Sequence, residues 1–324
     1  MSAPPIHDER TLDVGGGRVL AYSHNGDPGS STVLIFFHGM FGVGDAESVP
    51  CVVRERGIHY VLPTLPGMGS SSPVPSSAHY ANTLAHDISA LLNHLHPSSP
   101  NLRLYIAGGS FGCVPAQMLY GAPYAAFPQG RQIAGSLLIS GLSPFRHHRE
   151  HTKGMTLLNY IAVGPPSILL PFRLVPRLSS LFVQRKLRTQ ASAEALMRQL
   201  LFDKMDADEK QMLHAYAAAN GETEADIQAR MAANARRSVA RTWAGYLEIS
   251  DVLHGDWGFD PRALDAEHAG KPMYVVASAQ DDLGPEMARW MVENYQGAKF
   301  RELPGGHLAG MYYLDELFRE LLDL

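Results

Sequence analysis

A short glycine-rich motif around residue 110 has the residue spacing that is typical of a catalytic serine. The pentapeptide Gly108-Gly109-Ser110-Phe111-Gly112 has the form Gly-x-Ser-x-Gly. An apolar run at 102–107 precedes it and predicts a strand, and the residues at 113–120 predict a helix. The glycines let strand and helix approach closely, and the helix N-terminus favours the negative charge that develops when a serine attacks a carbonyl. We therefore expect Ser110 to be a nucleophile.

Two further side chains could complete a catalytic triad. The apolar segment 271–278 predicts a buried strand and is followed by Asp281 and Asp282. The segment 299–303 predicts another strand, which leads through Pro-Gly-Gly into His307. A histidine has the pKa to take the serine proton and return it to a leaving group, and an aspartate can hold the imidazole in one tautomer. We expect His307 to act as base and then acid, with one of the two aspartates as its partner.

The order serine, aspartate, histidine, each on a loop after a strand, resembles the α/β-hydrolase family, in the branch whose cap is inserted late in the chain. The resemblance implies a mostly parallel, twisted sheet with helices on both faces, together with a helical cap. It also implies a serine hydrolase whose triad is Ser110, Asp281 and His307 and which needs no cofactor.

The spacing around the acid favours one of the two aspartates. Family members often end this strand with glycine, two variable residues and aspartate, with a proline four residues further on. Ser278 stands here in place of the glycine, whereas Asp281 and Pro285 keep the spacing. Asp281 is therefore the expected acid, and Asp282 is the alternative.

A third segment matches the family near the N-terminus. The apolar run 32–37 predicts a strand that leads into His38, a glycine and Met40. By the resemblance, the backbone N–H groups of Met40 and Phe111 form the oxyanion hole. We expect His38 to orient this loop and not to transfer protons. A later loop resembles the family's Asp-x-Pro-Gly-x-Gly-x-Ser stretch, with Thr64 in place of the aspartate; this change concerns loop bracing and leaves the triad untouched.

Strands alternate with helices at both ends of the chain. This alternation predicts a largely parallel sheet covered on both faces. It stops after residue 144 and resumes at 271, so we predict an α/β-hydrolase core of residues 1–144 and 255–324 and a helical cap of residues 145–254. The expected core elements are a hairpin at 12–14 and 18–23, strands at 33–37, 59–62, 102–107, 133–140, 271–278 and 299–303, and helices near 45–56 and at 81–95.

The predicted cap would roof the site and limit substrate size. Helical periodicity marks 192–202, 206–220 and 223–247. The stretch 169–178 is apolar with spaced arginines. This stretch could form a gate for hydrophobic substrates or a patch that contacts a membrane surface. Alternatively, it forms part of the core of the cap, with its arginines extending to water, and we favour this interpretation.

One motif points to a different chemistry. Residues 147–151, His-His-Arg-Glu-His, fit the H-x-x-E-H pattern of inverted zinc proteases, with histidines on one helical face. A third ligand would have to come from Glu194, Asp206 or Glu222. The segment follows a predicted sheet strand, where a polar cap entrance is expected. We favour that interpretation and expect no metal.

Composition fits a single enzyme with a large core. The chain has 324 residues, of which 45% are hydrophobic and 18% charged, and its formal net charge of −5 argues against a nucleic-acid partner. No secretory signal precedes residue 9, no apolar run is long enough for stable membrane insertion, and two cysteines make no disulfide framework. We expect a cytoplasmic protein, with Cys113 packed beside the elbow; the oligomeric state is left open.

These residues predict hydrolysis of carboxylic esters of small to medium hydrophobic substrates through an acyl-enzyme intermediate. The same triad serves C–C bond hydrolases, lactonases, thioesterases, amidases and acyltransferases, which remain alternatives. A dehalogenase or epoxide hydrolase is disfavoured, because related enzymes need a carboxylate at the position of Ser110. A ligand receptor built on a hydrolase fold is the alternative that is not an enzyme.

Overall fold

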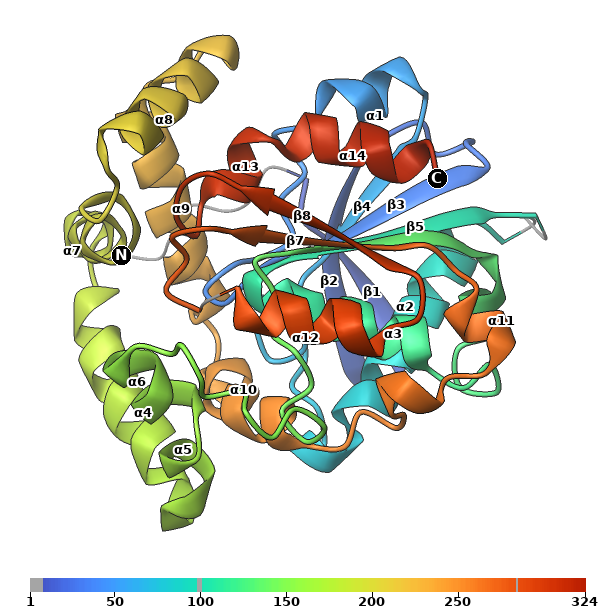
Figure 1. The fold of residues 1–324 in the computed structure, drawn as a ribbon, viewed down its shortest axis with the longest axis horizontal. Helices are drawn as coiled ribbons and strands as arrows, with labels where there is room; N and C mark the ends of the chain where they lie inside the picture. The colour runs from blue at the N-terminus through green and yellow to red at the C-terminus, as the bar shows by residue number, and fades with distance from the viewer. Residues whose placement is uncertain (1–7, 98–100, 284) are drawn as a thin grey trace.

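An eight-stranded sheet runs through the computed structural model, which describes residues 8–97, 101–283 and 285–324 (Figure 1). The strand order is β1-β2-β4-β3-β5-β6-β7-β8; β2 pairs antiparallel with β1 and β4, and every later pairing is parallel. The expected mostly parallel fold is therefore confirmed. The strands are β1 (Arg10–Gly15), β2 (Arg18–Gly26), β3 (Thr32–Phe37), β4 (His59–Pro63), β5 (Arg103–Gly109), β6 (Ile133–Ile139), β7 (Met273–Ser278) and β8 (Ala298–Leu303).

Helices cover both faces of this sheet because successive strand residues point to opposite sides. On β3, Val33 and Ile35 join one core cluster and Leu34 joins the other. The first cluster takes in α2 (Tyr80–Leu95), α3 (Cys113–Gly121) and α12 (Glu286–Asn294), and the second takes in α1 (Cys51–Glu55) and α14 (Leu314–Leu322) (Figure 1). The carboxyl ends of the parallel strands consequently lie along one edge, where strand-end loops meet.

Most of the segment between β6 and β7 is helical, and the helices α4 to α9 lie beside the sheet, on the left of Figure 1. We call residues 145–254 the cap segment; this division of the chain stays a prediction. The last of its helices packs into the larger core cluster through Ile249, Val252 and Leu253. Its helices are α4 (Leu157–Val163), α5 (Pro166–Leu169), α6 (Leu174–Lys186), α7 (Gln190–Met197), α8 (Ala207–Ala219), α9 (Glu224–Ser238) and α10 (Ala244–His254).

Two expected helices differ from the structure. The single helix expected at 223–247 is instead two helices, α9 and α10. The chain between them is bonded to the loop after β4: Gly69 N–H donates to Ser238 O (2.8 Å), and Gly245 N–H donates to Gly67 O (3.0 Å). The helix expected near 45–56 is only α1. Upstream of it the chain is held without helix by side-chain bonds to its backbone, such as the one from Gly44 N–H to Thr64 Oγ1 (2.9 Å).

The preference for the stretch 169–178 as cap core is wrong. Leu169 is 75% exposed, Phe172 82% and Leu178 58%. The reason lies in α6, whose inward face carries Pro176 and Ser179 while its leucines point to solvent.

No helix among the described residues is long and apolar enough to cross a bilayer. The expectation of a chain start without a secretory signal falls mostly on residues 1–7, which lie outside the described residues.

Candidate active site

A strained turn after β5 presents Ser110. Its φ is +53°, a left-handed conformation that costs a non-glycine residue roughly 1–3 kcal/mol. The flanking glycines are sterically required here. A Cβ at Gly108 would lie 2.2 Å from Gly112 O, and a Cβ at Gly112 would lie 2.1 Å from Phe37 O. Strand β5, helix α3 and the end of β3 thus meet closely enough to hold the serine at the carboxyl edge of the sheet.

Three loops bring Ser110, His307 and Asp281 into one hydrogen-bonded row. Ser110 Oγ lies 3.0 Å from His307 Nε2, and His307 Nδ1 lies 2.9 Å from Asp281 Oδ2. Since a carboxylate only accepts hydrogen bonds, Nδ1 carries the proton and donates it to Asp281. The bare Nε2 then accepts the Ser110 hydroxyl, which is the arrangement that general-base activation requires.

The same contacts shift both pKa values. Burial disfavours a charged imidazole, but the hydrogen bond to Asp281 and the charge of that carboxylate raise the pKa of His307 above its ordinary value. Burial likewise opposes ionisation of Asp281, yet the hydrogen bond and charge of His307 lower its pKa below the ordinary value. The pair therefore favours an ionised aspartate beside a histidine that can hold a proton.

The neighbouring aspartate faces away from the histidine. The Asp282 carboxylate pairs with Lys204, and its backbone carbonyl accepts a hydrogen bond from Asn159 Nδ2 (3.2 Å). Both partners belong to the cap segment, so the cap segment is bonded to the loop after β7 through Asp282. Of the two aspartates, the geometry brings Asp281 to His307 and leaves Asp282 outside.

Two serines that the sequence did not single out as site residues stand behind Asp281. Ser140, directly after β6, is close enough to Asp281 for its side chain to help lower the pKa of that carboxyl. Ser140 Oγ also lies 3.3 Å from Ser278 Oγ, and both side chains are buried. If Ser140 donates to the carboxylate, its oxygen is free to accept from Ser278. The serine that replaces the family's glycine at 278 thus supports a hydroxyl relay to the acid.

A buried glutamate of the cap segment holds the histidine loop from the other side. Glu209 on α8 is 3% exposed, and its carboxylate packs against Gly306, whose backbone helps to hold the carboxylate in its charged form. A Cβ at Gly306 would lie 3.2 Å from Glu209 Oε2, so a larger residue there would push the carboxylate by a few tenths of an ångström. Burial raises the pKa of Glu209. Nothing in the local sequence distinguished this glutamate from other acidic residues in helical patterns.

The loop after β3 lies over the serine. A Cβ at Gly39 would be 3.2 Å from Ser110 Cβ, so the backbone that leads to Met40 passes directly beside the nucleophile. Among the described residues, no protein acceptor is found for the N–H of Met40 or of Phe111. Two free donors beside a serine are what an oxyanion hole requires.

His38 has a structural role in this loop. Leu65 N–H donates to its Nε2 (3.0 Å), so its Nδ1 carries the proton and donates to Gly39 O (2.8 Å). Burial lowers the pKa of His38 to about 4, which keeps the ring neutral. The residue therefore ties the loop after β3 to the loop after β4.

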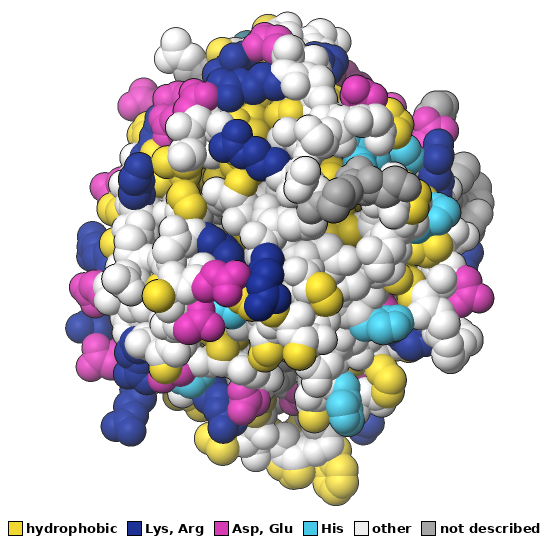
Figure 2. Space-filling view, turned by 90° about the vertical axis from the view of Figure 1, so that its right-hand side faces the viewer, with side chains coloured by type: hydrophobic (Ala, Val, Ile, Leu, Met, Phe, Trp, Pro, Cys, Tyr) yellow, Lys and Arg dark blue, Asp and Glu magenta, His cyan; other side chains and the backbone are white. Residues whose placement is uncertain are grey.

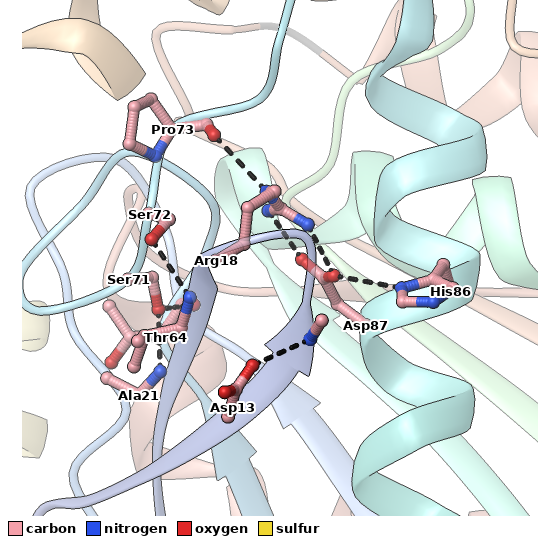
Figure 3. Close-up of polar contacts among 11 residues, drawn as sticks. Asp13, Arg18, Ala21, Thr64, Ser71, Ser72, Pro73, His86 and Asp87 are labelled. Atoms are coloured by element: carbon pink, nitrogen blue, oxygen red, sulfur yellow. Dashed lines mark hydrogen bonds and ion pairs between the residues drawn. The ribbon is translucent and has the colours of Figure 1, made fainter.

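Polar contacts brace the loop after β4 in turn (Figure 3). Ser71 Oγ donates to Thr64 O (2.7 Å) and accepts from Ala21 N–H (2.9 Å). Arg18 joins the hairpin to α2 through two bonds to Asp87, at 2.6 and 2.8 Å. Thr64 thus braces the loop with its backbone and hydroxyl at the position where the family usually has aspartate.

The H-x-x-E-H segment does not form the expected helical face, because residues 144–154 form turns and irregular structure without a helix. His148 stacks on Trp290 and bonds Ser143 Oγ (2.7 Å), while His151 stacks on Phe145. The possible third ligands are engaged elsewhere: Glu194 bonds Gln190, Asp206 caps α8 and Glu222 pairs with Arg230. Within the described part of the chain, no three His, Cys, Asp or Glu side chains are grouped to hold a metal ion.

The other nucleophile near the elbow is enclosed. Cys113 is fully buried, with Sγ 3.1 Å from Gly108 O and 3.3 Å from Ile139 O. Burial raises the pKa of this thiol far above its ordinary range, which makes it unreactive. The structure therefore agrees with the expected packing role.

Comparison with known proteins agrees with this architecture. The family model described as "Alpha/beta hydrolase family" matches residues 34–320, which is most of the chain. The chain belongs to the alpha/beta hydrolase family. The matched span runs from β3 to α14 and so includes the serine, aspartate and histidine loops of this hydrolase.

Solved structures of similar fold cover nearly the whole hydrolase at low sequence identity. A bromoperoxidase from Bacillus anthracis is 13% identical with a TM-score of 0.64, covering 98% of this chain and 100% of its own. An esterase from Rhodococcus sp. is 15% identical with a TM-score of 0.59, covering 98% and 100%. An enol-lactonase from Burkholderia xenovorans is 16% identical with a TM-score of 0.57, covering 97% and 98%. These likenesses establish the fold alone, and no curated protein sequence matches the chain.

Proposed function

We propose that this hydrolase cleaves carboxylic esters of small to medium hydrophobic substrates through an acyl-enzyme intermediate. One observation carries the proposal: the unbroken hydrogen-bond row from Ser110 Oγ through His307 to Asp281, with contacts of 3.0 and 2.9 Å. A serine in such a row, on a strained turn beside free N–H groups, has the parts that acyl transfer needs. The cytoplasmic location stays a prediction.

In the first half-reaction Ser110 Oγ attacks the ester carbonyl as its proton passes to His307 Nε2. The carbonyl oxygen becomes an oxyanion, which the N–H groups of Met40 and Phe111 stabilise. Asp281 stabilises the imidazolium through Nδ1. The tetrahedral intermediate then expels the alcohol, which takes the proton from His307, and leaves an ester on Ser110.

In the second half-reaction water attacks the acyl group while His307 Nε2 accepts its proton. The new oxyanion occupies the same hole, and its collapse returns the proton to Ser110 and releases the acid. Both halves use one base and one hole, and no step needs a metal or an organic cofactor.

Aromatic side chains beside the oxyanion loop support a hydrophobic substrate. Phe41 follows Met40 and stacks on Tyr246 of α10, with ring centroids 5.2 Å apart. Trp243 meets Tyr246 edge to face at 5.5 Å. A substrate held by the oxyanion hole would meet this cluster, and burial of each of its CH₂ groups there is worth about 0.8 kcal/mol.

The test is a series of p-nitrophenyl esters from acetate through butyrate to hexanoate. We expect kcat/KM to rise roughly threefold to fourfold per CH₂ until the binding space is filled. Ser110→Ala supplies the background rate at each length. A flat profile would refute the hydrophobic preference. Turnover below roughly one per minute on every ester, together with tight ligand binding, would instead indicate a receptor on a hydrolase fold.

A further inference from the structure

One stretch of the cap segment combines exposed apolar side chains with a uniform charge. Of the fifteen large hydrophobic residues that are exposed among those the structure describes, twelve lie between residues 157 and 182. Monomeric proteins rarely expose so continuous an apolar surface unless it meets a partner. Six of these side chains, Leu157, Leu158, Leu169, Phe172, Leu178 and Phe182, are 58–82% exposed.

Helix α6 differs from an ordinary surface helix because it presents a row of leucines to solvent. Leu174, Leu178 and Leu181 recur at helical spacing on its solvent side and are 44–58% exposed. Its inward side is partly polar: Ser179 Oγ accepts a hydrogen bond from Tyr246 OH (3.1 Å). Because the apolar stripe faces away from the rest of the protein, intramolecular packing cannot be its purpose.

The turn that precedes α6 projects an aromatic ring into solvent. Phe172 and Arg173 are consecutive non-glycine residues with φ of +61° and +53°. This conformation is costly for both residues, and it leaves the Phe172 ring 82% exposed. Strain of this kind is retained where the position of a side chain matters.

The charge of the same stretch identifies the kind of partner. Residues 151–193 contain six lysines and arginines and no aspartate or glutamate, although the whole chain has a net charge of −5. Arg173 pairs with Asp251 and Lys153 with Glu150, but Arg177, Arg185 and Lys186 have no acidic partner among the described residues. By contrast, the face away from the cap segment interleaves lysines and arginines with acidic side chains and carries scattered hydrophobic ones (Figure 2).

We propose that the outward side chains of residues 157–188, the basic apolar face, dock on the anionic surface of a lipid bilayer. The leucines and phenylalanines would enter the boundary between headgroups and acyl chains, with α6 in the plane of the surface. The arginines and Lys186 would reach the phosphates, since long cationic side chains extend from an apolar base. A bilayer accepts the whole face at once, whereas an acidic protein surface would leave the apolar side chains in water.

The docking face adjoins the candidate active site through α4. This helix exposes Leu157 and Leu158, and its Asn159 side chain donates to Asp282 O in the acid loop (3.2 Å). A docked enzyme would therefore hold its acid loop close to the lipid surface. That apolar esters could reach the enzyme from this surface is a consequence that rests on the proposed function.

The experiment measures binding to vesicles and does not require activity. Full-length protein is sedimented with vesicles of phosphatidylcholine alone or of phosphatidylcholine mixed with phosphatidylglycerol. We expect binding to the anionic vesicles, weaker at high salt, and little binding to the neutral ones. Leu178→Ser with Phe182→Ser should weaken binding on the order of tenfold or more, and Arg177→Gln with Arg185→Gln and Lys186→Gln on the order of a hundredfold.

The matched control is Lys299→Gln with Phe300→Ser on β8, an exposed cation and an exposed aromatic residue outside the docking face. This variant should bind like the wild type. Failure of the wild type to sediment with anionic vesicles would overturn the proposal, as would equal losses in the control. A dimer in light scattering that Leu178→Ser with Phe182→Ser dissociates, without vesicle binding, would show that a second copy covers the face and would also overturn it.

Discussion

Both carboxylate oxygens of Asp281 lie within hydrogen-bond distance of His307 Nδ1, at 3.0 and 2.9 Å. One of them also accepts from Leu283 N–H at 3.0 Å, so the carboxylate is fixed by its own loop while it orients the imidazole. The side chain of Asp281 is 4% exposed, which keeps water from competing for the proton on Nδ1. The adjacent Asp282 has none of these contacts.

Substitution of the two aspartates should separate their roles. Asp281→Asn should lower kcat on the order of a thousandfold or more, because an amide can donate to Nδ1 and thereby stabilise the wrong tautomer of His307. Asp282→Asn should change kcat by less than about threefold, since it loses only a surface pair with Lys204. Steady-state kinetics on one ester provides the comparison. The reverse ranking would transfer the role of the acid to Asp282.

The pH profile should report the raised pKa of His307. The base must be neutral to accept the serine proton, so activity is lost as pH falls through the pKa of His307. Because that pKa is raised, the acid limb of kcat/KM should have its midpoint above the ordinary histidine value of about 6.5. Residual activity of Asp281→Asn should show a midpoint at lower pH, since the charge that raises the pKa is gone. A wild-type midpoint at or below the ordinary value would contradict the pairing.

The two serine hydroxyls behind Asp281 should affect kcat unequally, the nearer one, Ser140, more than the farther one, Ser278. Ser140→Ala removes a hydroxyl that helps to lower the pKa of Asp281 and so to keep it ionised; kcat should therefore fall roughly tenfold with little change in KM. Ser278→Ala removes only the outer hydroxyl, 3.3 Å from Ser140 Oγ, and should cost about threefold or less. Thermal unfolding of both variants is the control. Equal kinetics for wild type and Ser140→Ala would show that the relay does not support the acid.

The sequence was sufficient for those parts of the fold that depend on local pattern. All eight strands were predicted within a few residues. The buried central ones followed from apolar runs of strand length, because buried parallel strands are nearly continuous in hydrophobicity. Ser110 and His307 were equally predictable, since glycines must flank a sharp turn and the residue order is distinctive. Asp281 needed its proline at residue 285 to stand apart from Asp282.

What could not be predicted depends on contacts distant in sequence. Ser140 and Glu209 lie 141 and 72 residues before Asp281, and only the folded chain shows that they reach its loop and that of His307. The orientation of α6 was mistaken for the same reason. An apolar stripe with helical spacing predicts a buried face. The local sequence does not show whether that face is buried within this protein or against another surface.

Covalent labelling tests the central claim most directly. A fluorophosphonate reacts with a serine only when a base activates it and donors stabilise the tetrahedral adduct. Peptide mapping of the labelled hydrolase should place the adduct on Ser110, and Ser110→Ala should lose both labelling and several orders of magnitude in kcat while its thermal unfolding is unchanged. An adduct on another serine, or full activity in Ser110→Ala, would contradict the assignment of Ser110, His307 and Asp281 as the catalytic row.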